Sequence, residues 1–468
     1  MNLQGKKALV IGMARSGQAA ARFLAKQGVQ VAGADQKDEK LLGPGSQDLK
    51  KLPVSLITGE YPEIKAGDYD LVIVSPGVPN NIEPIAAAER LNIPIWSELE
   101  LAGRFAQEPI IAVSGTNGKT TTTSLLGFIF KQAGIEAGVA GNIGTPLIQE
   151  VEKNRDGARG IKLWVVEVSS FQLERIVNFR PHIGVLLNLA PDHLDRHGNM
   201  ENYCRTKARL FANQSPADYA VFNLDDPLVL RYMNTVPARK YGFSCSRQPH
   251  EGGIGVRGKQ IIYTLRGKET TLCRTDQIRI PGHHNLENAL AAAAASLLAG
   301  VDRSCVAEAL ASFPGVAHRM EDVRVLDGVR YVNDSKGTNP DAVLKALDSY
   351  DGPIILIAGG RHKGSSLEQL AQKIRERVKA LILLGEAAPL FRQAAEAAGF
   401  KRIHEAPTLA DAVALAHRIA YHGDVVLLSP GCASWDMFRD YEERGDVFRK
   451  AVAGLQGGVK SEKRAQSP

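Results

Sequence analysis

Residues 110–134 hold the pattern that most restricts how this chain can fold. An apolar run over residues 110–113 predicts a buried strand, the polar run 114–122 follows it, and a second apolar stretch predicts a helix that ends near Gly134. A strand, a glycine loop and a helix in this order can bind phosphate, because the loop amides and the helix N-terminus direct partial positive charge at an anion. The pattern therefore predicts an α/β domain that binds ATP or GTP and moves a phosphoryl group.

The glycine loop is shorter than usual, because two residues rather than four separate Gly115 from Gly118. Lys119 is placed to reach the terminal phosphates, and the Thr120 hydroxyl is placed to hold Mg²⁺. The alternative is a glycine turn that only starts a helix, which the coincidence of strand, lysine, hydroxyl and helix disfavours. The predicted nucleotide-binding residues of this loop are Gly115, Thr116, Asn117, Gly118, Lys119, Thr120 and Thr121.

Length and composition indicate a multidomain globular protein. With 468 residues the chain predicts two to four domains of roughly 100–200 residues each. The five cysteines are widely spaced and form no Cys-x-x-Cys pair, which argues against a zinc ribbon or a disulfide framework and fits a reducing compartment. A net charge of +6 is weak evidence for nucleic-acid binding, and no apolar run of about 18 residues or signal peptide points to a membrane. We expect a cytoplasmic monomer with small-molecule partners, no nucleic acid and no membrane.

Residues 7–35 predict a βαβ unit with a glycine turn between Gly12 and Gly17 and a second strand that ends at Asp35. An acid about 20 residues after the glycines resembles the dinucleotide fingerprint. The middle glycine of that fingerprint is replaced by Ala14. The turn therefore favours a nucleotide other than NAD, and NAD stays as the alternative.

Apolar runs that alternate with helical segments continue along the chain, a pattern that predicts parallel sheets covered by helices. Residues 250–280 are more polar and more β-like than the rest. The predicted strands include residues 71–74, 93–96, 163–168, 183–188, 218–223, 329–334, 353–358, 380–385 and 424–429.

We therefore expect an α/β protein of three domains in series. Residues 1–97 would form a Rossmann-like N-terminal domain. Residues 98–315 would form a central P-loop ATPase-like domain with a parallel sheet and a small β part. Residues 316–468 would form a C-terminal Rossmann-like domain whose tail is disordered from about residue 455.

Glu167 lies inside an apolar strand, where a carboxylate is costly unless it is paired or bound to a metal. The ends of strands face the ligand in α/β folds, so Glu167 is a candidate second ligand of Mg²⁺. The alternative is a structural acid in a salt bridge.

Residues 191–197 place two acids, two histidines and an arginine directly after a predicted strand. His193 and His197 are four residues apart, so on a helix they could share a zinc ion, although no third ligand is evident. We favour a loop beside the phosphate site that helps to bind metal or substrate. The alternative is that these polar side chains only face solvent.

Polar residues after later predicted strands indicate a second-substrate pocket. Asn288 could read an adenine edge, and Arg319, at a predicted domain junction, could stabilise transferring charge. The segments 333–339, 359–364 and 429–436 are polar loops that each follow a strand of one domain, and cationic side chains there suit a carboxylate.

The order of these motifs resembles the Mur ligase family, the ATP-dependent amino-acid ligases of peptidoglycan synthesis. The shortened loop at 115–121 is the form that this family uses. Within the family the chain is most similar to the member that adds D-glutamate to UDP-N-acetylmuramoyl-L-alanine. The similarity covers nearly the whole chain and rests on the N-terminal glycine turn and on the segments 167–173, 192–196, 333–339 and 429–434.

The resemblance implies roles for the nucleotide and its metal. Asn288, Arg319 and Asp334 would bind ATP. Two Mg²⁺ ions are expected, one held by Thr120 and the other by Glu167, His193 and Lys207. The lysine at this last place is carbamylated in the family, and a carbamate offers Mg²⁺ an anionic oxygen where an ammonium would repel it. The catalytic residues would be Lys119, His193, Lys207 and Arg319.

The resemblance also implies roles for the two other substrates. The UDP substrate would be bound by Ser16, Asp35, Ser75, Asn142 and Ser169. The D-glutamate would be bound by Lys336, Thr338, Lys363, Ser434 and Tyr441.

Three positions depart from the family pattern. Ala14 replaces a frequent glycine, Gly337 stands where alanine is common, and Arg361-His362 precede Lys363 where an acid is often found. The rival interpretations are a sister ligase that adds another amino acid, such as a folate-glutamate ligase, a noncatalytic protein switched by nucleotide, and an NAD-linked dehydrogenase.

Overall fold

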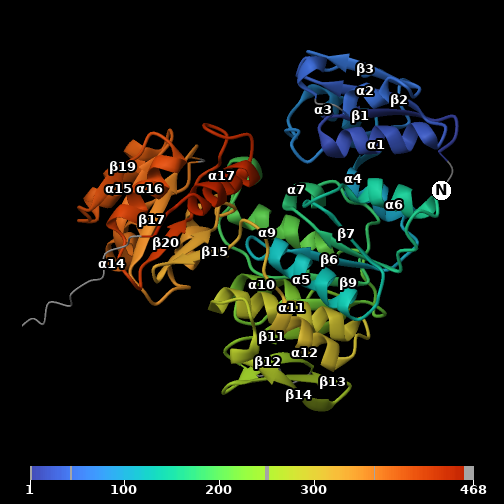
Figure 1. Cartoon of the computed structure of the whole chain (residues 1–468). Coiled ribbons are helices and arrows are strands. Elements are labelled where there is room, and N and C mark those ends of the chain that lie inside the picture. Colours follow the sequence, from blue (N-terminus) through green and yellow to red (C-terminus); the bar gives the residue numbers. More distant parts are fainter. Residues whose placement is uncertain (1–2, 43–44, 248–251, 363, 458–468) are drawn as a thin grey trace, which may run out of the picture. The chain divides into compact units, whose positions relative to one another are not determined.

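The computed structural model describes residues 3–42, 45–247, 252–362 and 364–457, and these residues build three sheets with helices packed against them (Figure 1). This architecture confirms the predicted α/β class with three domains. The boundaries predicted after residues 97 and 315 stay predictions, and the end of the predicted disordered tail, from residue 458, lies outside the described residues.

The first sheet is fully parallel, with the strand order β3-β2-β1-β4-β5. Alternate residues of its strands point to opposite faces, so Ala8 and Val10 join one buried cluster with α1, while Leu9 and Ile11 join another with α3. Its elements are β1 (Lys7–Ile11), α1 (Arg15–Lys26), β2 (Gln30–Asp35), η1 (Glu39–Leu41), α2 (Gly45–Leu49), β3 (Val54–Thr58), β4 (Leu71–Val74), α3 (Glu83–Arg90) and β5 (Ile95–Ser97).

The second sheet has nine strands in the order β14-β13-β12-β11-β10-β9-β6-β8-β7. Its pairings are parallel from β7 to β12, and β12–β13 and β13–β14 are antiparallel, which is the small β part predicted for the central domain. Its strands are β6 (Ile110–Ser114), β7 (Ala137–Gly141), β8 (Leu163–Glu167), β9 (Ile183–Leu186), β10 (Tyr219–Asn223), β11 (Arg239–Ser244), β12 (Gly253–Arg257), β13 (Gln260–Leu265) and β14 (Lys268–Arg274).

Among the described residues, eleven helical segments accompany this sheet. The helix α5 begins at Lys119, directly after Gly118 of the predicted nucleotide loop, and α11 begins at His283. The segments are α4 (Glu98–Phe105), α5 (Lys119–Gln132), α6 (Leu147–Arg155), α7 (Ser170–Leu173), α8 (Leu194–His197), α9 (Met200–Ala208), η2 (Arg209–Phe211), α10 (Pro227–Met233), η3 (Thr275–Gln277), α11 (His283–Leu298) and α12 (Arg303–Ser312), with the turn 115–118 between β6 and α5.

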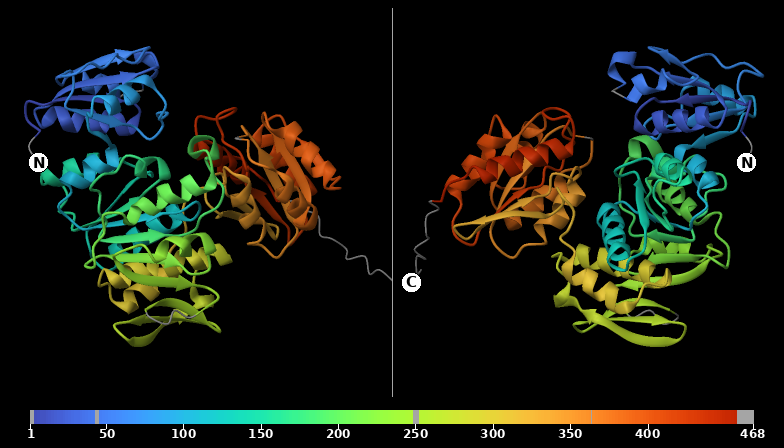
Figure 2. Two further views of the ribbon diagram at one scale, coloured as in Figure 1. Left: turned by 180° about the vertical axis from the view of Figure 1, so that it is seen from behind. Right: turned by 45° about the vertical axis from the view of Figure 1, so that its right-hand side comes forward.

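The third sheet has the order β15-β16-β20-β17-β18-β19 and is parallel except for the β15–β16 pair. Leu356 faces a cluster with α13, α14 and α15, while Ile355 and Ile357 face α16 and α17 on the other side. Figure 2 shows helices on both faces of this orange and red sheet. Its elements are β15 (Glu321–Leu326), β16 (Val329–Asn333), α13 (Pro340–Leu347), β17 (Ile354–Gly359), α14 (Glu368–Arg377), β18 (Val378–Leu384), α15 (Ala388–Ala397), β19 (Ile403–Glu405), α16 (Leu409–Ile419), β20 (Val425–Leu428) and α17 (Tyr441–Ala453).

Contacts between residues divide the chain into two units. The first unit combines residues 1–279 with 285–313, and the second unit combines residues 280–284 with 314–468. In the second unit His284 lies 3.4 Å, Nδ1 to Oγ, from Ser349, and burial lowers the pKa of His284 to about 3. The segment 280–284 therefore belongs to the second unit, although the residues on both sides of it belong to the first.

Among the described residues, no helix combines the length and the apolar character needed to cross a bilayer.

Candidate functional site

The loop after β6 requires glycine at its last position. Gly118 has a φ of 86° and directly precedes α5, so it adopts the left-handed conformation that favours glycine. A Cβ at Gly118 would lie 2.1 Å from Asn288 Oδ1. The same Oδ1 lies 3.4 Å from the hydroxyl of Thr122, which donates to it. The predicted Asn288, on α11, is thus packed against the nucleotide loop.

Two lysines converge on one carbonyl of this loop. Lys119, the first residue of α5, donates from Nζ to the carbonyls of Gly115 at 2.9 Å and Thr116 at 2.8 Å. Lys207, on α9, donates from Nζ to the same Gly115 carbonyl at 2.8 Å and is 2 % exposed. Burial and then the charge of Lys119 hold the pKa of Lys207 well below its usual range, which favours the uncharged amine.

Side chains from distant segments hold the loop in shape. Asn188 accepts from the amide of Asn117 at 2.8 Å and donates to its carbonyl at 3.1 Å. Thr116 Oγ1 donates to the Ala190 carbonyl at 3.1 Å and lies 3.0 Å from the Tyr203 hydroxyl. Asn188 and Tyr203 were not predicted as site residues. The position of Asn188 at the end of a predicted strand is a signal that could have found it, and Tyr203 had none.

The carboxylate of Glu167 ends β8 and is 1 % exposed. Its Oε1 accepts from Asn142 Nδ2 at 2.8 Å, and its Oε2 is buried without a hydrogen-bond partner among the described residues. The partner of the carboxylate is an amide rather than a cation, which counts against the alternative of a salt-bridged structural acid. An orphaned buried oxygen fits a hard cation such as Mg²⁺, which prefers oxygen ligands.

Thr120 and His193 are two further predicted metal ligands. Thr120 is buried in the first turn of α5, and His193 lies with Nε2 3.6 Å from Asp192 Oδ2. Within the described ranges no group of three or more His, Cys, Asp and Glu side chains is placed to hold a metal ion.

The geometry removes the basis of the zinc alternative. His193 precedes α8 with a φ of 51°, so it does not share a helical face with His197. His197 is buried, with Nε2 3.1 Å from Ser170 Oγ and Nδ1 3.7 Å from Glu174 Oε1. Both rings pack against Phe171, but the polar contacts of His197 differ from the contact of His193 with Asp192.

The glycine turn after β1 brings the predicted UDP-substrate residues together. Ser75 Oγ donates to the Gly12 carbonyl at 2.6 Å. Asp35 Oδ2 accepts from the amide of Met13 at 2.7 Å. Ser16 lies half-buried in the first turn of α1. The turn is therefore braced by the ends of two neighbouring strands, β2 and β4.

Asn142 and Ser169 lie after β7 and β8, at the carboxyl edge of the second sheet. The amide group of the Asn142 side chain is held by Glu167, as described above. Ser169 caps α7 in a reciprocal pair with Gln172, in which Ser169 Oγ donates to Gln172 Oε1 at 2.9 Å. A ligand of Ser169 would have to share this hydroxyl with the cap.

In the second unit, Asp334 follows β16 and is buried. Its Oδ2 accepts from Ser429 Oγ at 2.7 Å and its Oδ1 accepts from the amide of Met320 at 3.3 Å. Burial raises the pKa of Asp334 to about 6, against the lowering effect of the Arg319 charge. His318 and Met320, on both sides of Arg319, have φ values of 61° and 47°, a strained backbone of the kind that functional sites retain.

The predicted amino-acid-binding residues also lie in the second unit. Lys336 Nζ lies 5.0 Å from the centre of the Tyr441 ring, a cation–π distance. Thr338 lies two residues after Lys336, and its backbone amide donates to the Lys336 carbonyl at 2.9 Å. Ser434 is buried after β20. Lys363 lies outside the described residues.

A buried arginine that sequence analysis missed joins the loops of this region. Arg444, on α17, donates from Nε to Ser335 Oγ at 3.0 Å and from Nη2 to the Cys432 carbonyl at 3.2 Å. Burial lowers the pKa of Arg444 to about 10. The amide of Gly431 donates to the Gly337 carbonyl at 2.8 Å, and a Cβ at Gly337 would lie 2.5 Å from Asp334 Oδ2. The departure to glycine at position 337 thus leaves room for the buried carboxyl group.

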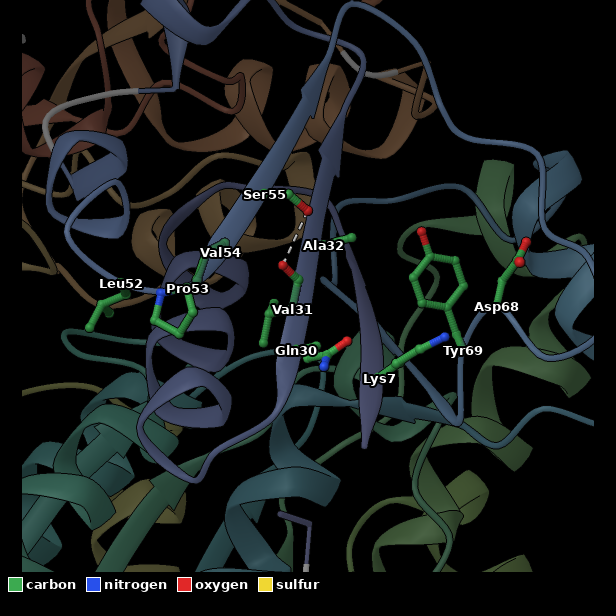
Figure 3. A pocket seen from close by; sticks show the side chains of 10 residues that line it. All are labelled: Lys7, Gln30, Val31, Ala32, Leu52, Pro53, Val54, Ser55, Asp68 and Tyr69. Atoms are coloured by element: carbon green, nitrogen blue, oxygen red, sulfur yellow. Dashed lines mark hydrogen bonds between the residues drawn. The ribbon is translucent and has the colours of Figure 1, made fainter. Parts of the chain in front are cut away.

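A separate groove of about 510 Å³ lies at the amino ends of β1, β2 and β3 (Figure 3). Ser55 donates there to the Val31 carbonyl at 3.4 Å, and Lys7 and Tyr69 line the other side. Ligands of parallel α/β sheets bind at the carboxyl ends of strands, the edge where Gly12 lies. The groove is therefore not part of the predicted site.

The two units thus hold two groups of predicted residues. The first unit brings together the nucleotide loop, Glu167, Lys207 and Asn288, and separately the turn with Ser75 and Asp35. The second unit holds Arg319, Asp334 and the amino-acid-binding group. That both groups serve one reaction stays a prediction.

Three family models match successive parts of the chain. The model described as "Mur ligase MurD-like, N-terminal domain" matches residues 6–97, "Mur ligase middle domain" matches residues 113–296, and "Mur ligase, glutamate ligase domain" matches residues 318–432.

Relatives of similar length share much of the sequence. The chain is 52 % identical over 453 residues, covering 97 % of this chain and 98 % of the relative, to a protein of Pelotomaculum thermopropionicum named UDP-N-acetylmuramoylalanine--D-glutamate ligase. A protein of the same name from Geotalea daltonii is 47 % identical over 98 % of this chain and 99 % of its own length.

Solved structures share the fold at low sequence identity. UDP-N-acetylmuramate-alanine ligase MurC from Thermotoga maritima superposes with a TM-score of 0.60 at 19 % identity, covering 96 % of this chain and all of that one. A pseudomurein peptide ligase type C from Methanothermus fervidus superposes with a TM-score of 0.58 at 19 % identity, covering 97 % of this chain and all of the other. The three consecutive domain matches, together with relatives about half identical over nearly the full length, show that this chain belongs to the Mur ligase family.

Proposed function

We propose that this chain is an ATP-dependent ligase that joins D-glutamate to UDP-N-acetylmuramoyl-L-alanine in peptidoglycan precursor synthesis. The observation that carries the proposal is the convergence of Lys119 and the buried Lys207 on the nucleotide loop, next to the orphaned oxygen of Glu167. The names of relatives at 47–52 % identity support the choice of substrates.

In the first step the muramoyl-alanine carboxylate attacks the γ-phosphorus of ATP, which gives an acyl phosphate and ADP. Lys119 would release the loop carbonyls and donate to the transferring phosphoryl oxygens, where its charge stabilises the transition state. Arg319 would supply a second cation, while Asn288 and Asp334 would bind the nucleotide. This step is needed because a free carboxylate is a poor electrophile.

Lys207 is suited to carbamylation. Carbamate formation needs an uncharged amine that attacks CO₂ and loses a proton, and the lowered pKa of Lys207 favours that form. The carbamate, Glu167 and His193 would hold one Mg²⁺ and the Thr120 hydroxyl the other. Bound Mg²⁺ supplies charge neutralisation for the phosphate oxygens.

In the second step the amine of D-glutamate attacks the acyl carbon, an amide bond forms, and inorganic phosphate leaves with the bonding pair of the C–O bond. Lys336, Thr338, Lys363, Ser434 and Tyr441 would bind D-glutamate, with Lys336 offering a cation to a carboxylate. Ser16, Asp35, Ser75, Asn142 and Ser169 would bind the UDP substrate. Water must be excluded from the acyl phosphate during this step.

We further propose that the protein works in the cytoplasm as a monomer. The proposed substrates are small molecules, and the reaction needs no nucleic acid or membrane. A role in cell-wall biogenesis, and through it in cell shape and division, follows from the proposed product.

The test is phosphate release from ATP and Mg²⁺ with UDP-N-acetylmuramoyl-L-alanine, with and without D-glutamate, and with other amino acids in its place. Release that needs both proposed substrates is the expected result. Release with a different amino acid would move the chain to a sister step of the family. ATP binding without release under any pairing would favour a nucleotide-switched binding protein instead.

A further inference from the structure

One side chain of the first unit ties together segments that the proposed reaction needs. Arg196, on α8, donates from Nε to Glu174 Oε1 at 2.9 Å and from Nη2 to Glu174 Oε2 at 2.6 Å, so the pair is bidentate. Its Nη1 donates to the carbonyl of Val78 at 2.8 Å. Glu174 Oε2 also accepts from Asn80 Nδ2 at 2.9 Å. The loop 75–80, which follows β4, is therefore bound at one point to Arg196 of α8 and at another to Glu174, which follows α7.

This link is better protected than a surface ion pair. The side chains of Arg196 and Glu174 are 15 % and 10 % exposed, and the guanidinium group lies 4.5 Å from the centre of the Phe171 ring. Burial and the ring contact strengthen a charge pair that water and salt would otherwise weaken. We therefore expect the link to hold Glu174 and α8 together more firmly than an exposed ion pair would.

On one side the link leads to His193. The His193 carbonyl accepts from the amide of Arg196 at 3.1 Å, and the His193 ring meets Phe171 edge-on at 4.7 Å. His193 has a left-handed backbone, an arrangement that persists only where its surroundings enforce it. Arg196 and Phe171 are part of those surroundings.

On the other side the link leads to the turn after β1. The amide of Val78 donates to the Ser75 carbonyl at 3.1 Å, and Ser75 Oγ donates to the Gly12 carbonyl at 2.6 Å. A Cβ at Gly12 would lie 2.5 Å from Val78 Cγ2, so the turn and the loop 75–80 are in close contact. A ligand that shifts the turn therefore acts on the segment to which Arg196 is bound.

We infer that Arg196 is a positioning residue that couples occupation of the turn after β1 to the placement of His193. The inference rests on the proposed function, because it takes that turn as part of the UDP-substrate site and His193 as a metal ligand. Binding of the UDP substrate increases the affinity for Mg²⁺, and this coupling depends on the side chain of Arg196.

The test compares wild type with Arg196→Lys and Asn80→Ala, and uses Arg257→Lys as the control. Arg257 forms an exposed bidentate pair with Glu269 on the antiparallel part of the second sheet, so the control makes the same chemical change far along the chain from the link. The first measurement is the dissociation constant of Mg²⁺ from calorimetric titration, without and with saturating UDP substrate. The others are the KM for the UDP substrate and the Mg²⁺ concentration at half-maximal phosphate release, at low and at saturating UDP substrate.

In wild type, saturating UDP substrate should lower the half-saturating Mg²⁺ concentration by about fivefold or more, the size of a typical coupling between sites. Arg196→Lys should abolish this shift and raise the KM more than it lowers kcat, and Arg257→Lys should behave as wild type. Asn80→Ala, at an exposed position, should reduce the Mg²⁺ shift. The double variant should show the same Mg²⁺ shift and KM as Arg196→Lys alone, because both changes break one link.

A full Mg²⁺ shift in Arg196→Lys, or additive effects of the two changes, would overturn the inference while leaving the proposed function intact. If Arg196→Lys does not fold, an undiminished shift in Asn80→Ala overturns the inference in the same way. A wild type that releases no phosphate would overturn the proposed function, and the inference with it.

Discussion

The chain contains two strand–glycine turn–helix units that differ in the charge brought to the turn. After β1, the carboxylate of Asp35 accepts from a turn amide and the Ser75 hydroxyl donates to a turn carbonyl. After β6, the amines of Lys119 and Lys207 donate to the carbonyl of Gly115. One turn is therefore closed by an acid and a hydroxyl, and the other is surrounded by nitrogen donors.

The local pattern of strand, glycine turn and helix does not decide which ligand a glycine turn binds. Both turns follow a buried parallel strand and start a helix, so both have amides that could face an anion. Side chains from elsewhere make the difference, because Asp35 accepts from an amide of its turn while Lys207 adds an amine to the other. We expect triphosphate chemistry only at the second turn.

The largest effect should come from removing the cation next to the second turn. Lys119→Ala should lower kcat by about 10²–10³-fold, because a preorganised donor to the transferring phosphoryl group is lost. Phosphate release measures the change, and circular dichroism verifies the fold. Lys131→Ala, an exposed position at the end of the same helix, should leave turnover unchanged. Unchanged turnover in Lys119→Ala would end the assignment of triphosphate chemistry to this turn.

The next largest effect concerns the second amine of that turn. Lys207→Arg should lower kcat by about 10²-fold, since arginine stays charged and cannot form a carbamate. Wild-type activity should fall in CO₂-depleted buffer and recover with bicarbonate, whereas Lys207→Arg should not respond. Lys162→Arg, at an exposed site, should respond as wild type. A wild type indifferent to CO₂ would contradict carbamylation.

The same lysine gives a pH prediction with a definite sign. The pKa of Lys207 is lowered in the folded protein and is ordinary in the unfolded chain, so the folded state binds fewer protons between the two values. In CO₂-free buffer the free energy of unfolding contributed by this group should therefore rise as pH increases through that window. Chemical denaturation of wild type and Lys207→Met at several pH values measures the difference, and a contribution that falls with increasing pH would contradict it.

A pair of glycine variants, one in each unit, tests whether the two turns are separate binding sites. Gly118→Ala places a Cβ 2.1 Å from Asn288 Oδ1, and Gly17→Ala places one 1.9 Å from the Gly12 carbonyl oxygen. Gly118→Ala should weaken ATP binding about tenfold and spare UDP-substrate binding, while Gly17→Ala should do the reverse and cost about 1–3 kcal/mol of stability through overpacking. Calorimetric titration of both ligands measures the pattern. If each variant lost both ligands equally, the two turns would not be separate sites.

The smallest effect belongs to the hydroxyl that closes the first turn. Ser75→Ala should lower the free energy of unfolding by about 1 kcal/mol, because the buried Gly12 carbonyl loses its donor, and should raise the KM for the UDP substrate a few-fold. Ser55→Ala, an exposed hydroxyl at the other edge of the same sheet, is the control. Equal effects of the two variants would remove the special role of Ser75.

Much of the fold could be predicted because buried parallel strands are continuous apolar runs. The predicted strand 71–74 coincides with β4, and the one at 163–168 differs from β8 by a single residue. The strands β3 and β7 were not predicted, because β3 has no fully buried residue and β7 contains only alanine, glycine and one valine. Short strands of this kind are defined by their neighbours in the sheet rather than by their own residues.

The site was predictable where its chemistry is local in sequence. Lys119 and Thr120 lie within the loop pattern, and Glu167 was conspicuous as an acid in an apolar strand. Asn188 and Tyr203 were missed, because they reach the loop from 71 and 87 residues away and their residue types carry no signal of that partner. The cap formed by Ser169 was readable from the glutamine three residues later.

The segment 280–284 determines how this protein can be taken apart. A fragment that starts at residue 316 would lack these residues of its own unit, including His284, and a fragment that ends at residue 313 would carry them without their contacts in the second unit. A protease that cuts between residues 313 and 314 would break the chain without separating the pieces. The two products should therefore elute together in size-exclusion chromatography until denaturant is added.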